Sequence, residues 1–147
     1  MEEQALLDAW YIRLPRYVLI GDLIPNRRVL EVGCGEGAAC NFLADRGARY
    51  VCGIDASVEA VEQARRQHRR AGVEFRVMER GRLELDDASF DLVLVPEGAE
   101  VVPDDGLLDE LRRVLRRDGH LLIAVPNGDR SVRVMSKTVC STWASST

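Results

Sequence analysis

Apolar residues in this chain of 147 residues form short runs that alternate with stretches of amphipathic spacing. Short continuous apolar runs are typical of buried parallel strands, whereas apolar residues three and four positions apart indicate a helix. We interpret the following runs as strands: Arg28–Val32, Tyr50–Asp55, Val73–Glu79, Leu92–Val95 and His120–Val125. Helical spacing predicts helices between them at residues 38–46, 57–70 and 103–117. Strands that alternate with helices predict an α/β fold built on a mostly parallel sheet.

The segment ahead of the first strand, residues 1–27, is expected to be largely helical. Apolar positions in Glu2–Ile20 have helical spacing, which Pro15 interrupts. The first residues are acidic and lack the basic-then-apolar order of a signal peptide. No apolar run approaches the length of a membrane span. We therefore expect a cytoplasmic protein with no membrane partner.

The overall charge is mildly acidic, with a net charge of −4 and a pI near 5.3, which gives no reason to expect nucleic acid as a partner. Arginines cluster near the ends of two predicted helices, but Glu62–Arg66 and Asp109–Arg113 have the spacing of helical ion pairs. Solvated helix faces therefore explain both clusters. The four cysteines lack the spacing of a zinc site or a disulfide framework, so that we expect reduced cysteines and no metal.

The first predicted strand leads into a turn in which Gly33, Gly35 and Gly37 alternate with Cys34 and Glu36. A helical pattern begins directly afterwards. A strand, a glycine-rich turn and a helix start form the nucleotide-binding element of doubly wound α/β folds. Glycines permit the tight turn and let a cofactor lie against bare backbone. The unpaired N–H groups of the helix start face the same place.

Two acidic residues accompany this turn. Asp55 ends the second predicted strand, 18 positions beyond Gly37, where a carboxylate can accept hydrogen bonds from both hydroxyls of a ribose. Glu31 lies inside the first strand, before the first glycine. Dinucleotide-binding folds usually have no acid at that position, so that the pair indicates a variant of the nucleotide-binding element.

The pattern acid-x-Gly-x-Gly-x-Gly, followed by Gly-x-Asp, resembles the class I, Rossmann-like, S-adenosylmethionine-dependent methyltransferases from about Val29 to Val125. The resemblance implies a doubly wound, mostly parallel sheet of strand order 3-2-1-4-5 with helices on both faces. It also implies S-adenosylmethionine as the cofactor. The cofactor-binding residues that it implies are Glu31, Gly33, Cys34, Gly35, Gly37, Asp55, Ala56, Glu79 and Pro96.

The resemblance assigns different parts of the cofactor to different residues. The glycines would let the backbone approach the methionine and ribose portions, Glu31 would position the loop and the amino-acid end, and Asp55 would hold the ribose. Glu79 stands where the family commonly has an aspartate that binds the amino group of adenine. The alternative for Glu79 is a plain glutamate at the end of a strand.

The methyl acceptor is expected at the carboxyl end of the fourth strand, where open α/β sheets hold their ligands. Ser89–Val93 resembles the family's entry to this strand, and Pro96 and Glu97 follow it. The family's reaction is an in-line displacement at a sulfonium methyl group, in which the protein mainly aligns the reactants. No catalytic residue is therefore assigned. Glu97 or Glu100 could accept a proton, although an exposed loop acid is the default interpretation.

Three further side chains have both a functional and a plain interpretation. Tyr11 and Tyr17 could reach the cofactor from the first helix, but packing of that helix against the sheet is favoured. His120 could serve as a catalytic base. Its position at the start of a strand, far from the ligand edge, favours a surface histidine.

The C-terminal end is short for this family, whose full domains carry a further helix and two more strands after the fifth strand. Only residues 126–147 remain here, enough for a helix or one strand. We expect one C-terminally abbreviated domain, 1–147, with a helical segment (1–27), a cofactor-binding core (28–126) and a short tail (127–147). An uncovered fifth strand would expose a sheet edge. A fragment of a longer chain, a minimal domain, or burial of that edge by a partner or a second copy would each account for it.

Three functions agree with these features. The first is a methyltransferase that acts on a small molecule or on a protein group. The second is a methyltransferase-like module without turnover that binds or scaffolds, because the tail is short and the residues around Glu79 depart from the family's pattern. The third is a nicotinamide oxidoreductase, which shares the fold. It is disfavoured by the acid Glu31 ahead of the first glycine and because Ala38 stands where the GxGxxG pattern requires its last glycine. Methylation of nucleic-acid bases is disfavoured separately, because the family's motif for it, Asn/Asp-Pro-Pro-aromatic, is absent.

Overall fold

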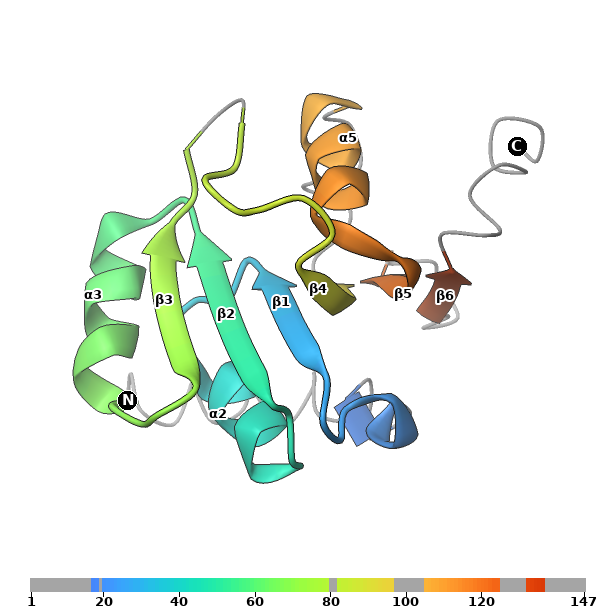
Figure 1. Ribbon diagram of the computed structural model, residues 1–147. Helices are drawn as coiled ribbons and strands as arrows, with labels where there is room; N and C mark the ends of the chain where they lie inside the picture. The colour runs from blue at the N-terminus through green and yellow to red at the C-terminus, as the bar shows by residue number, and fades with distance from the viewer. Residues whose placement is uncertain (1–16, 19, 80–81, 97–104, 125–131, 137–147) are drawn as a thin grey trace.

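The computed structural model describes residues 17, 18, 20–79, 82–96, 105–124 and 132–136. Its strands and longer helices are β1 (Arg28–Val32), α2 (Ala38–Asp45), β2 (Tyr50–Asp55), α3 (Val58–Gln67), β3 (Val73–Val77), β4 (Phe90–Val95), α5 (Asp105–Val114), β5 (Leu115–Ala124) and β6 (Val132–Ser136) (Figure 1). A short 3-10 helix, Gly21–Leu23, precedes β1. β1 and β2 have the predicted bounds. None of the helices in the described ranges is long and apolar enough to cross a membrane.

The strands form one sheet in the order β3-β2-β1-β4-β5-β6 (Figure 1). Neighbouring strands from β3 to β5 run parallel, and β6 runs antiparallel to β5. The predicted order 3-2-1-4-5 is therefore confirmed. The strand order reverses between β1 and β4, and ligands of open α/β sheets bind at the carboxyl ends of the strands beside such a reversal.

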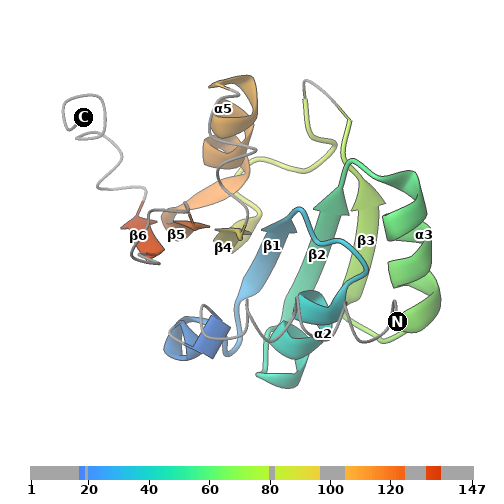
Figure 2. The ribbon, with the colours of Figure 1, turned by 180° about the vertical axis from the view of Figure 1, so that it is seen from behind.

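Helices cover both faces of the sheet, as predicted. Seen from behind, α2 lies in front of the lower part of β2 (Figure 2). One buried cluster joins residues of α2 and α3 to strand positions such as Val29. The other cluster joins Leu111 and Val114 of α5 to Leu30 and Val93. Adjacent residues of a strand thus enter opposite layers, because successive side chains of a strand point to opposite faces.

The boundary between α5 and β5 differs from the predicted helix to residue 117. α5 ends at Val114, and Leu115 already pairs with Phe90, while the next pairing of β5 begins at His120. The intervening residues form a bulge that ends at Gly119, where a Cβ would lie 2.5 Å from Leu115 Cδ1. The predicted helix is too long because Leu115 continues the apolar spacing of α5. The buried side chain of Leu115 belongs instead to β5.

The lateral edge of the sheet beside β5 also differs from the expectation of an uncovered fifth strand. β6 pairs with β5 over residues 120–124, so that β5 is an internal strand in the part of the chain that the structure describes. The expectation is wrong because the five residues Val132–Ser136 suffice to pair with this whole run. Within the described residues, β5 is thus already paired over residues 120–124, and β6 is the edge strand on that side of the sheet.

Gly53 allows the glycine-rich turn to lie directly on β2. The amides of Gly33 and Cys34 both donate to the backbone oxygen of Ile54, at 2.7 and 3.0 Å. A Cβ at Gly53 would lie 2.8 Å from Cys34 Cβ and 2.8 Å from Cys40 Sγ. Because real Cβ atoms do not approach so closely, any side chain at position 53 would displace the turn from β2.

We expect Gly53→Ala to lower the free energy of unfolding by about 1–3 kcal/mol through overpacking. Urea denaturation followed by circular dichroism measures this change. Gly21→Ala is the matched control, because a Cβ at Gly21 meets nothing within 4 Å, and its effect should stay within about 0.5 kcal/mol. Equal stability of the two variants would show that the turn does not depend on close contact with β2.

Candidate functional site

The glycine-rich turn presents bare backbone at the carboxyl end of β1. Gly33 and Gly35 have φ values of +82° and +54°, a region that side chains rarely adopt. A Cβ built on either residue would meet no heavy atom within 4 Å. The turn therefore faces open space at these two positions, and a bound molecule could lie directly against the backbone there.

The other predicted turn residues, Gly37 and Cys34, pack the turn onto the sheet. Gly37 is the N-cap residue of α2 with a φ of +90°, and a Cβ there would lie 2.7 Å from Phe75 Cζ. Cys34 is buried, and its amide bonds to β2 as described above. These two residues hold the turn in place, whereas the other two glycines face open space.

Asp55 ends β2, and its carboxylate connects two loops. Oδ2 accepts the N–H of Gly35 at 2.9 Å, and Oδ1 accepts the N–H of Ser57 at 2.9 Å. The backbone oxygen of Asp55 accepts the N–H of Met78 at 2.8 Å. A carboxylate has about four acceptor positions, so that these bonds leave capacity for further donors. Ala56, the next residue, is exposed.

Glu31 is buried in β1 with 1% of its surface exposed. The hydroxyl of Tyr17 donates to Glu31 Oε1, and the thiol of Cys40 in α2 donates to Oε2 at 3.2 Å. A buried carboxylate is tolerated when such donors surround it. These bonds tie α2 and the segment before β1 to the central strand. Tyr17 is itself buried, in agreement with the packing interpretation, and its hydroxyl bonds to the strand.

Two titratable groups beside the turn are held in their neutral forms. A hydrogen bond with Cys34, burial and the charge of Glu31 raise the pKa of Cys40 well above its usual value. The protonated thiol can therefore donate to Glu31. Burial lowers the pKa of His68, which lies against the same turn near Gly37. In the described ranges no cluster of three His, Cys, Asp or Glu side chains could hold a metal ion.

Glu79 is exposed and lines a cavity of about 400 Å³. The walls include Ile54 and Val77 from the ends of β2 and β3, and Leu83 and Leu85 from the connection to β4. Because Ile54 directly precedes Asp55, the cavity adjoins the end of β2 that carries the bridging carboxylate. Glu79 thus lines a cavity that reaches the end of β2, although no residue of the glycine-rich turn lines it.

Pro96 lies at the carboxyl end of β4, and its neighbours differ from those of Glu79. It borders a small apolar cavity lined by Tyr17, Ile20, Leu94 and Leu122.

His120 is half-buried and pairs with Leu92 near the start of β4, away from the carboxyl ends of the strands. The candidate residues Glu97, Glu100 and Tyr11 lie outside the described residues.

The bond between Tyr17 and Glu31 is a feature that the sequence did not predict. An acid inside an apolar strand requires a donor nearby, so that the sequence signalled a partner. It did not identify this one, because the two residues are 14 positions apart and belong to different elements. Ser57 caps α3, with its hydroxyl accepting the N–H of Ala60 at 3.2 Å.

Comparison with known proteins agrees with this geometry. A family model described as "Methyltransferase domain" matches residues 30–123. The chain is 39% identical over 125 residues to a fatty-acid O-methyltransferase of Mycolicibacterium smegmatis, an alignment that covers 83% of this chain and 45% of that protein. It is 29% identical over 140 residues to a ubiquinone biosynthesis O-methyltransferase of Neisseria meningitidis, covering 83% and 59%.

A solved structure supports the fold in the same way. The structure of geranyl diphosphate methyltransferase in complex with SAM has a TM-score of 0.67 and 19% identity to this chain. The match covers 76% of this chain and 48% of that one, and at this identity the likeness concerns the fold alone. The chain spans about half the length of the curated relatives described above.

We expect Asp55→Asn to lower the free energy of unfolding by about 1–3 kcal/mol. An amide has one acceptor oxygen, so that its NH₂ group would face the N–H of Gly35 or of Ser57. Urea denaturation measures the loss. The control is Asp45→Asn, which removes an ion pair with Arg70 from a carboxylate that is 59% exposed and should change stability by about 0.5 kcal/mol at most. If Asp55→Asn had the same free energy of unfolding as wild type, the bridging role of Asp55 would be contradicted.

Proposed function

Because the chain belongs to the class I, Rossmann-like family of methyltransferases, whose cofactor is S-adenosylmethionine, we propose that it transfers the cofactor's methyl group to a small-molecule acceptor. The observation that carries this proposal is the open backbone at Gly33 and Gly35 beside the carboxylate of Asp55. A side chain at either glycine would fill the space that the cofactor needs. The residues present therefore fit the group.

The proposal assigns separate tasks to the residues of the site. Gly33 and Gly35 would lie against the methionine and ribose portions of the cofactor. Asp55 would accept hydrogen bonds from the ribose hydroxyls with the capacity that its two backbone bonds leave. Glu79 and the adjoining cavity would receive the adenine. Glu31 would act from below the surface, by holding α2 and Tyr17 against the strand that carries the turn.

The cofactor, when bound, supplies an activated sulfonium methyl group. The protein's own contribution is then to align the acceptor with that group and to exclude water. The rigid turn suits this task because its backbone is bonded to Ile54 and Asp55.

The relatives favour an apolar small molecule with an oxygen acceptor. Their names describe O-methylation in fatty-acid and ubiquinone chemistry. The carboxyl end of β4, where open α/β sheets hold their ligands, is the expected place for such an acceptor. We therefore place the acceptor there, and methylation of a protein group becomes the less favoured form of the proposal.

The alternative functions receive less support. The inactive module was suggested by the short tail and by the residues around Glu79. However, the two curated relatives are named as methyltransferases, and Glu79 lines a cavity that reaches the end of β2. The hypothesis of a nicotinamide oxidoreductase is wrong, because the family model of the methyltransferase domain matches residues 30–123.

Calorimetric titration with S-adenosylhomocysteine tests the proposal, with NAD as the competing ligand. We expect binding of the former alone. Gly35→Ala should weaken that binding by about tenfold or more, because its methyl group enters the cofactor's space.

Gly72→Ala is the matched control for this titration. Gly72 also has a positive φ, +81°, but its Cβ position lies 3.5 Å from the backbone oxygen of Arg49, outside the site. Gly72→Ala should strain the backbone and leave the affinity unchanged. No binding by folded wild-type protein, or equal affinities of the two variants, would contradict the proposal.

A further inference from the structure

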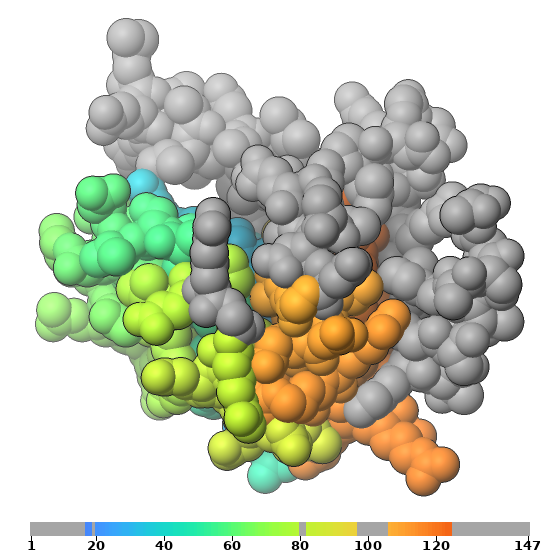
Figure 3. Space-filling view, turned by 90° about the horizontal axis from the view of Figure 1, so that it is seen from above, coloured from blue at the N-terminus to red at the C-terminus, as the bar shows by residue number. Residues whose placement is uncertain are grey.

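The connection between β3 and β4 forms one wall of the cavity beside Glu79. Its residues 83–85, which we term the 83–85 segment, line the cavity together with Ile54 and Val77. The segment has no strand partner among the described residues. Viewed from above, the yellow-green surface of this connection lies against the orange surface of α5 (Figure 3). The position of this wall therefore depends on contacts other than a sheet ladder.

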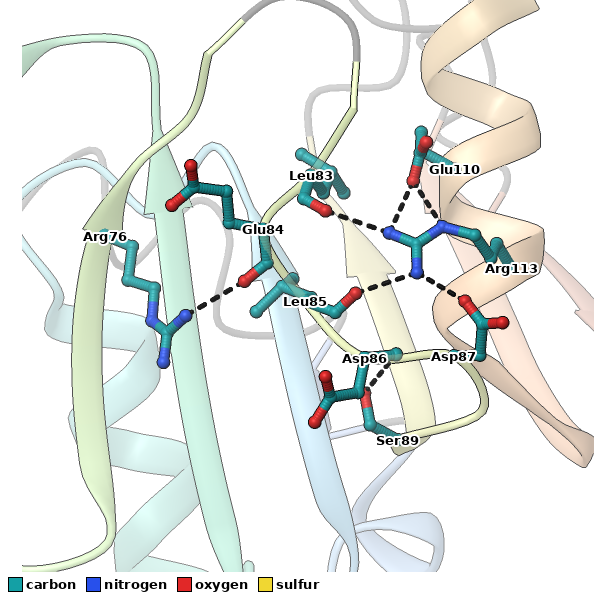
Figure 4. Close-up of polar contacts among 9 residues, drawn as sticks. All are labelled: Arg76, Leu83, Glu84, Leu85, Asp86, Asp87, Ser89, Glu110 and Arg113. Atoms are coloured by element: carbon teal, nitrogen blue, oxygen red, sulfur yellow. Dashed lines mark hydrogen bonds and ion pairs between the residues drawn. The ribbon is translucent and has the colours of Figure 1, made fainter.

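Two arginines hold the backbone of the 83–85 segment from opposite sides (Figure 4). From α5, Arg113 donates to the backbone oxygens of Leu83 and Leu85, at 2.9 and 2.8 Å. From β3, Arg76 donates to the backbone oxygen of Glu84 at 3.0 Å. Three consecutive carbonyl groups are thus bonded to guanidinium groups, which replace the missing ladder bonds.

Arg113 is held in one orientation by its own partners. Glu110 Oε2 accepts from Arg113 Nε at 2.7 Å and lies 2.7 Å from Arg113 Nη2. Asp87 Oδ1 accepts from Arg113 Nη1 at 2.6 Å (Figure 4). The Arg113 side chain is 21% exposed. A planar guanidinium can serve two carbonyls and two carboxylates at once, whereas a lysine ammonium donates from a single point.

The sequence suggested a plainer role for this arginine, an ion pair with Asp109 on a solvated helix face. The structure instead pairs Asp109 with Arg112 at 3.6 Å and directs Arg113 to the cavity wall. The prediction is wrong because backbone oxygens, which have no signature in the sequence, compete for the guanidinium. The Glu62–Arg66 pair is confirmed, also at 3.6 Å.

We propose that Arg113 is a positioning residue for the adenine end of the cofactor, acting through the backbone of the 83–85 segment. The inference rests on the proposed function. Leu83 is buried in the core beside α5, which anchors the segment's side chain, and Arg113 fixes the backbone that faces the cavity. Through this contact α5 sets the distance between the wall and Glu79, and hence how well the adenine edge is recognised.

The test compares S-adenosylhomocysteine with S-inosylhomocysteine, which carries hypoxanthine in place of adenine. Both are titrated calorimetrically into the wild-type chain, Arg113→Lys and Arg112→Lys. We expect wild type to prefer the adenine compound. In Arg113→Lys the affinity for it should fall by about tenfold, and the preference for adenine should shrink by a similar factor, because one ammonium cannot hold both carbonyls. Arg112→Lys, whose ion pair stays within α5, should match wild type.

The ratio of the two affinities separates positioning from stability. A purely structural role would lower the melting temperature of Arg113→Lys and leave the adenine preference intact, which would overturn the inference. Equal binding of both compounds by wild type would also overturn it. If Arg113→Lys does not fold, Glu110→Gln serves instead, because it loosens the same guanidinium and should reduce the preference severalfold. Failure of wild type to bind S-adenosylhomocysteine would instead reject the proposed function itself.

Discussion

The carboxylate of Asp55 is the contact on which the site depends. One oxygen accepts the amide of Gly35 and the other accepts the amide of Ser57, so that a single side chain sets the β1–α2 turn relative to the start of α3. The backbone of the same residue accepts the amide of Met78 beyond β3. The carboxyl ends of three neighbouring strands are therefore joined at one residue, which keeps the glycine-rich turn rigid without using side chains of the turn.

The two faces of the sheet support this edge in different ways. On one face, buried Glu31 binds Tyr17 and Cys40 and holds α2 below the turn, while Gly53 leaves room for the turn on β2. On the other face, α5 reaches the β3–β4 connection through Arg113. The α2 side thus fixes the backbone that would meet the ribose and methionine, and the α5 side fixes the wall beside Glu79.

The sequence predicted the fold, and it placed the glycine-rich turn and Asp55 at neighbouring strand ends, because both follow from local patterns. β1 and β2 are mostly apolar runs, and the alternating glycines and Asp55 stand at their ends. Prediction failed where tertiary contacts decide. Leu115 has helical spacing but belongs to β5, Tyr17 finds Glu31 from another element, and Arg113 bonds to backbone oxygens. The roles of all the candidate residues in cofactor binding, Ala56 and Pro96 included, stay predictions.

The central claim, that the turn joined to Asp55 is the cofactor site, is tested most directly by NMR of the isotope-labelled chain titrated with S-adenosylhomocysteine. The account predicts that the largest changes in amide chemical shift fall on Gly33, Gly35 and Ser57, with smaller changes at Glu79. Changes confined to residues far from the turn, such as those around Arg70, would contradict it.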